Sequence, residues 1–150
     1  MVETKIKITV EIDASAEVVF KAISLPKELI NWFPDDAMLE PRVGGKFMVA
    51  FLKDSKKPRM KMDRDFINEG KILEIINNKK LVHTWQWKAF SGFPETVVTW
   101  ELENVNKNKT RLTLTHLGFT GKEEGSASVQ EHHKGWTFFL NELVSYCKKK

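Results

Sequence analysis

The central part of the sequence contains six strand patterns in a row, each joined to the next by a connection of hairpin length. The patterns are rich in β-branched and aromatic residues and are separated by turn-forming Gly, Asn and Pro. Strands joined in this way pair antiparallel, so the stretch predicts a mostly antiparallel sheet. A polar segment over 54–63 is expected to form one long hairpin loop. The predicted strands are 37–41, 46–53, 65–76, 80–88, 95–104 and 110–116.

Strand and helix patterns flank this central stretch. Apolar and polar residues alternate over Lys5–Ile12, which predicts a strand with one buried face. Two short helices follow: one begins behind Ser15, a favourable N-cap, and the other spans Pro26–Asn31, because Pro suits a first helical turn. A long C-terminal helix is predicted from Ser128, where Glu131 completes a capping box. Its wide apolar face consists of Val129, His132, Trp136, Phe139, Leu140 and Leu143. Gly135 lies inside this helix, where glycine is costly, and is interpreted as a place where the backbone passes close to the sheet or another helix.

These elements predict an α+β fold with the order β-α-α-β6-α. A curved, seven-stranded antiparallel sheet is expected to wrap around the long C-terminal helix, because that helix must cover the apolar side of the sheet. The 150 residues fit a single domain over 1–150. A domain of this size buries roughly 68–70% of the surface that its unfolded chain exposes, which supports a core without metals or disulfides.

Composition limits the classes of partner and location. The net charge is +4, but the lysines are scattered and form no continuous basic face, so we expect no nucleic-acid partner. No apolar run approaches ~20 residues, and the N-terminus lacks a signal-peptide pattern, so we expect a cytoplasmic protein without membrane insertion. Cys147, the only cysteine, is interpreted as a half-buried structural thiol of a reducing compartment and not as a nucleophile.

Several short motifs occur in order along nearly the whole chain. They are Ile12–Phe20, Trp32-Phe33, Pro41–Phe47 around a Gly-Gly turn, Glu69–Ile75, Leu81–Trp85, Thr110–His116, and His132–Trp136 with Leu140. Together they resemble the family of activator of heat shock protein 90 ATPase homologues. That family belongs to the START-like (SRPBCC) superfamily of helix-grip domains, which are relatives of the birch pollen allergen. The resemblance implies the same helix-grip fold.

The resemblance also implies a range of functions. Some members of the superfamily bind small apolar ligands, and others have cyclase, dehydratase or hydrolase-like chemistry. The eukaryotic co-chaperone carries this domain behind a separate chaperone-binding domain, which this sequence does not contain. Direct activation of the chaperone ATPase is therefore not expected from this resemblance alone.

Aromatic side chains are the most prominent candidates for a site. Trp85 and Trp87 share one strand face, and Trp100 and Trp136 lie on the inward faces of another strand and of the last helix. Two interpretations stay open: the aromatic residues fill the core, or they line a pocket for a flat apolar ligand. The candidate ligand-binding residues are Trp32, Phe33, Phe47, Trp85, Trp87, Trp100, His116, His132 and Trp136. Of these, Trp32 and Phe33 are expected at the mouth between the helix and the sheet.

Polar candidates are fewer. His116 is expected to be a buried, neutral imidazole bonded to backbone, or alternatively a group that orients a ligand or acts as a base. One of Glu69 and Glu74 should point inward if their strand is regular, whereas Glu101 should face solvent. Three residues of the loop after the second helix are candidates for a polar headgroup: Asn31, Asp35 and Asp36. No zinc-site spacing, catalytic triad or nucleotide fingerprint is present, so no metal or cofactor is expected and the catalytic residues stay unknown.

The leading hypothesis is a non-enzymatic or weakly catalytic domain that binds a small hydrophobic molecule between the sheet and the C-terminal helix. The first alternative is a co-chaperone or stress-related interaction domain, whose lysine-rich surface would meet an acidic partner such as the chaperone. The second alternative is a cyclase- or hydrolase-like enzyme that uses the same cavity.

Overall fold

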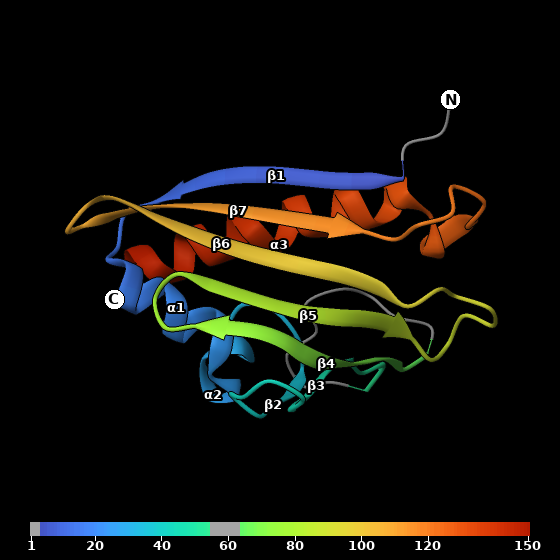
Figure 1. Cartoon of the computed structure of the whole chain (residues 1–150). Coiled ribbons are helices and arrows are strands. Elements are labelled where there is room, and N and C mark those ends of the chain that lie inside the picture. The colour runs from blue at the N-terminus through green and yellow to red at the C-terminus, as the bar shows by residue number, and fades with distance from the viewer. Residues whose placement is uncertain (1–3, 55–63) are drawn as a thin grey trace.

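A single seven-stranded sheet bends around one long helix (Figure 1). The structure is a computed structural model that describes residues 4–54 and 64–150. The strand order is β1-β7-β6-β5-β4-β3-β2, and every neighbouring pair is antiparallel. The predicted α+β class and the β-α-α-β6-α order are therefore confirmed. The strands are β1 (Lys5–Ile12), β2 (Asp36–Leu39), β3 (Lys46–Phe51), β4 (Phe66–Ile76), β5 (Lys80–Trp87), β6 (Thr96–Asn106) and β7 (Lys109–Leu117).

The helices are α1 (Ala16–Ser24), α2 (Pro26–Leu29) and α3 (Val129–Lys148), with a short 3₁₀ turn, η1 (Gly125–Ala127), before α3. Helix α2 ends at Leu29, two residues earlier than the sequence predicts, and residues 55–63 of the predicted hairpin loop lie outside the described residues. Helices α1 and α2 lie near the C-terminal half of α3 (Figure 1). They therefore close one end of the space between α3 and the sheet.

Local sequence explains where the helices begin. The Ser15 hydroxyl accepts a hydrogen bond from the Val18 amide, and the Ser128 hydroxyl accepts one from the Glu131 amide. The second bond of a capping box, from the Ser128 amide to the Glu131 side chain, is replaced: the Ser128 amide donates to the Gly125 carbonyl of the preceding turn. The six predicted apolar positions of α3 are all buried, which fixes the face that the helix turns toward the sheet.

The thiol of Cys147 belongs to the same buried face of α3. Its exposed fraction is 1%, so the sequence-based interpretation of a half-buried thiol is wrong on this point. Burial in apolar surroundings raises the pKa of the thiol to about 12, with a further contribution from Glu28. The thiol is therefore protonated at neutral pH and contributes to packing, which agrees with a structural role.

Gly135 offers the first test of stability. The sequence suggested that a glycine inside α3 reflects a close approach of another element, but a Cβ atom built there has no neighbour within 4 Å among the described residues apart from adjacent residues and the backbone of its own helix. Gly destabilises a helix interior by about 1 kcal/mol relative to Ala. We therefore expect Gly135→Ala to raise the free energy of unfolding by roughly 0.5–1 kcal/mol, as measured by urea denaturation. An unchanged or lower midpoint would contradict this.

Candidate functional site

The nine candidate residues lie together on the inner side of the sheet. Phe33, on the turn after α2, occupies the centre of this aromatic layer. Its ring centroid lies 5.2 Å from Trp32, 5.5 Å from Trp136 and 6.4 Å from Trp85. The ring of Phe33 is 2% exposed, so it is a core residue and not the mouth residue that the sequence suggested.

Trp85 connects the strands to α3. Its ring lies 5.0 Å from that of Trp136, 5.2 Å from Trp87 and 6.3 Å from Phe47. Trp136 also makes an edge-to-face contact with Trp100 at 5.5 Å. Aromatic pairs at these separations add stability beyond the area they bury. The helix register that places Trp136 against the sheet is therefore the one that the sequence predicts.

Three indole N–H groups of this layer donate to three buried imidazoles. Trp100 donates to Nε2 of His83 at 3.0 Å, and Trp87 donates to Nε2 of His132 at 2.8 Å. Because those nitrogens accept, the opposite Nδ1–H groups donate to backbone carbonyls, His83 to Thr84 and His132 to Ser128. Both nitrogens of each ring are therefore used inside the protein.

His116 follows the same pattern with the opposite tautomer. Its Nδ1 accepts from the Trp136 indole at 3.0 Å, so its Nε2–H donates to the Thr96 hydroxyl at 2.7 Å. The Thr96 hydroxyl then donates to the backbone carbonyl of Trp85. The expected bond from His116 to backbone is thus replaced by bonds to two side chains. No ring nitrogen of His116 is left over to act as a base.

Burial keeps these imidazoles neutral. Loss of water lowers the pKa of His83 to about 4, although its bond to the Thr84 carbonyl acts in the opposite direction. Loss of water also holds the pKa of His116 well below its ordinary value, and the neighbouring His132 and His83 contribute to this. The pKa of His132 is lowered mainly by its burial. Neutral rings are required here, since a protonated ring could not accept an indole hydrogen.

Trp85 differs from the other four tryptophans in its hydrogen bonding. Trp32 donates to the Ala22 carbonyl at 2.9 Å, and three others donate to histidines. Within the described residues the buried Nε1–H of Trp85 has no acceptor. The Nδ2 group of Asn68 is a second buried donor without a partner, although its Oδ1 accepts from the Gln86 amide. Buried donors are almost always bonded, so these two groups need an explanation.

Both unpaired donors face the inner side of the sheet. Asn68 is fully buried and pairs in register with Val49 on one side and with Trp87 on the other. The strand pattern did not single out Asn68. The signal that could have identified it is an amide at an inward position of β4, two residues after Phe66.

A half-buried aromatic cluster lies next to these donors. Phe66, Trp87 and Phe90 are partly exposed, and their ring centroids lie within 5.7–6.2 Å of one another. Phe51 joins the cluster to the core, with its ring 6.1 Å from Trp87. The aromatic layer thus continues from the fully buried centre to a part of the surface.

The acidic candidates do not contribute to this layer. Glu69 is exposed, whereas Glu74 is partly exposed and forms an ion pair with Lys80 at 3.3 Å. A β-bulge between Ile72 and Glu74 shifts the register of the strand between these two acidic residues. We expected one of these two residues to point inward only if the strand is regular. The strand is irregular, so this expectation does not apply. Glu101 is exposed, as predicted.

The polar residues after α2 have structural partners. The amide of Asn31 donates to the Lys27 carbonyl, and a carboxylate oxygen of Asp35 accepts from the Leu52 amide. Asp36 accepts from the amide of Ala37. Within residues 4–54 and 64–150, no group of three His, Cys, Asp or Glu side chains is arranged to hold a metal ion.

The comparison with protein families agrees with this architecture. Residues 13–148 match the model of the family described as "Activator of Hsp90 ATPase homolog 1-like protein". The chain belongs to this family. No curated protein matches the sequence.

Solved structures similar to this Hsp90-activator-like chain share its fold at low sequence identity. Protein CV1439 from Chromobacterium violaceum has a TM-score of 0.79 at 18% identity, with 97% of this chain and 99% of that chain covered. PFC0360w, an HSP90 activator from Plasmodium falciparum, has a TM-score of 0.71 at 24% identity, with 94% of each chain covered. These values establish similarity of fold.

A third similar structure is DynU16, a putative protein of the dynemicin biosynthetic locus, with a TM-score of 0.75 at 19% identity. The match covers 96% of this chain but only 47% of DynU16, so the chain spans about half of that protein. Among the helices that the structure describes, none has both the length and the apolar character needed to cross a membrane.

Proposed function

We propose that this protein binds a small, mostly apolar molecule on the inner side of the sheet, and that the molecule carries one hydrogen-bond acceptor. The observation that carries the proposal is the buried Nε1–H of Trp85, which has no acceptor within the described residues; Nδ2 of Asn68 is a second such donor on the same side of the sheet. A buried donor that is left unpaired costs about 1–3 kcal/mol. An acceptor oxygen of a ligand would remove that cost at the one indole that the protein does not satisfy itself.

The surroundings of these donors suit an aromatic or alicyclic ligand. The rings around Trp85 form a large apolar layer, and the half-buried cluster of Phe66, Trp87 and Phe90 extends this layer to the surface. A few fixed polar groups within an apolar lining are typical of small-molecule sites. The three imidazoles use both nitrogens internally, which favours binding over acid–base catalysis by these groups.

A matched pair of probes tests this function. 2-Acetylnaphthalene has a carbonyl acceptor, whereas 2-isopropenylnaphthalene has nearly the same shape with a methylene group in place of the oxygen. We expect the ketone to bind more tightly to the wild type, by roughly 5- to 10-fold, which corresponds to one net hydrogen bond. Titration calorimetry and quenching of tryptophan fluorescence measure both affinities.

The variant Trp85→Phe keeps an aromatic ring and removes the donor. It should bind both probes with similar affinity, because only the preference for the ketone depends on the indole N–H. The control Phe138→Leu changes an exposed side chain of α3 and should keep the preference. If neither probe binds the wild type, or if Trp85→Phe retains the preference, the proposal is wrong. The co-chaperone interpretation stays a separate prediction.

A further inference from the structure

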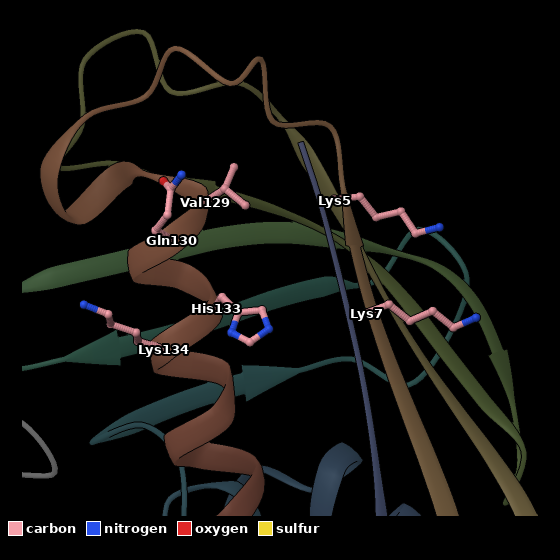
Figure 2. A pocket seen from close by; sticks show the side chains of 6 residues that line it. All are labelled: Lys5, Lys7, Val129, Gln130, His133 and Lys134. Carbon is pink, nitrogen blue, oxygen red and sulfur yellow. The ribbon is translucent and has the colours of Figure 1, made fainter. Parts of the chain in front are cut away.

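A groove lies between the start of α3 and the edge strand β1, and the buried Val129 forms part of its lining. We call it the β1–α3 groove; its volume is about 690 Å³. Figure 2 shows His133 directed from α3 toward β1, while the lysines lie at the two outer sides. The residues that line it are Lys5, Lys7, Val129, Gln130, His133 and Lys134.

One wall of the groove is the outer edge of the sheet. β1 is the first strand in the sheet order, and among the described residues only β7 pairs with it. The backbone N–H and C=O groups on its other edge can therefore receive a further strand. An exposed edge of this kind is a template for β-augmentation, in which an extended peptide adds main-chain hydrogen bonds to the sheet.

The positive charge of the lysines around the groove favours an acidic peptide. Lys5 and Lys7 form no ion pair within the described residues, and both are exposed. Lys134 pairs with Glu131 at 3.5 Å on the exposed side of α3, where such pairs contribute little. The rim of the groove thus carries an excess of positive charge, which attracts an acidic segment and repels a basic one.

We propose that the β1–α3 groove binds an acidic peptide segment in extended conformation, which pairs with the outer edge of β1. Alternate side chains of such a strand point to opposite faces of the sheet, so acidic residues at every second position would follow Lys5 and Lys7 along β1. A second copy of this chain is the alternative occupant, and the sedimentation experiment below distinguishes it from an acidic peptide. This interaction surface is independent of the ligand site at Trp85.

The probe is a fluorescein-labelled peptide of about eight residues that alternates Glu and Val. We expect its binding, followed by fluorescence anisotropy, to weaken when salt rises from about 50 mM to about 300 mM. The double variant Lys5→Glu/Lys7→Glu should weaken binding at least about 10-fold. In a ¹⁵N-labelled sample, the shifted amides should lie in β1 and in the first turns of α3.

Two controls separate main-chain pairing from general charge. Lys46 and Lys71 are exposed cross-strand partners on β3 and β4, so Lys46→Glu/Lys71→Glu makes the same change in charge away from the groove. This variant should bind the probe nearly as well as the wild type. A peptide that is N-methylated at alternate residues should lose binding, because it cannot donate to the edge of β1.

Three outcomes would overturn the proposal: equal loss in both double variants, undiminished binding of the N-methylated peptide, or absence of binding at low salt. Sedimentation velocity provides a fourth criterion. A dimer of the wild type that Lys5→Glu/Lys7→Glu alters would show that a second copy occupies the edge instead.

Discussion

Replacing Trp136 by Ala should lower the free energy of unfolding by roughly 3–5 kcal/mol, because the space it leaves is bounded by rigid rings that cannot collapse. The indole is 3% exposed and contacts Phe33, Trp85 and Trp100. Its removal also leaves Nδ1 of His116 without a donor. Urea denaturation followed by far-UV circular dichroism measures the loss.

Phe138→Ala is the matched control, since Phe138 lies on the same helix but is 45% exposed. It should change stability by no more than about 0.5 kcal/mol. Trp136→Leu should recover part of the stability through apolar filling, but not the bond to His116. A wild-type urea midpoint for Trp136→Ala would contradict the packing of α3 against the sheet.

Acid should destabilise the protein already between pH 7 and pH 5. His83 takes up a proton near pH 6.5 in the unfolded chain but near pH 4 in the folded one. The unfolded state therefore binds more protons in between, and stability falls as pH drops through this range. Between pH 7 and pH 5, His83 alone should account for about 2 kcal/mol. His116 and His132 act in the same direction, because their pKa values are also lowered.

The variant His83→Gln identifies the source of this acid sensitivity. A glutamine side chain can accept from Trp100 and donate to the Thr84 carbonyl without titrating. Urea denaturation at both pH values should show a smaller difference in His83→Gln than in the wild type. Equal differences in the two proteins would exclude His83 as a source. Both pH values lie above the range in which Glu28 and Glu123 take up a proton, because the pKa values of these two carboxyl groups are lowered.

Periodicity was sufficient to predict the order of the elements and the inward faces of β1 and α3. The strand Lys5–Ile12 has the predicted bounds, and the six apolar positions of α3 are buried as expected. These features depend on residues close together in sequence, so a pattern of period two or 3.6 reports them directly. The placement of Trp136 near Trp85 and Trp100 follows from the same faces once α3 must cover the sheet.

The hydrogen bonds between side chains far apart in sequence could not be predicted from periodicity. The three indole–imidazole bonds join residues that lie 17, 20 and 45 positions apart. A face assignment gives a histidine an inward direction but does not choose its partner. The unpaired donor of Trp85 is recognised only by accounting for every other indole. The bulge before Glu74 and the open space at Gly135 also depend on neighbours that the local pattern does not contain.

The pairing of β1 with β7 has a consequence for synthesis on the ribosome. Thr9 and Thr113 lie opposite each other but 104 residues apart in sequence. At a translation rate of roughly 5–20 residues per second, β7 is synthesised roughly 5–20 seconds after β1. During that time the apolar side of β1, which includes Ile6 and Ile12, has neither its neighbouring strand nor α3 to cover it. The alternating lysines of β1 then protect the nascent chain from aggregation before they can serve the folded protein.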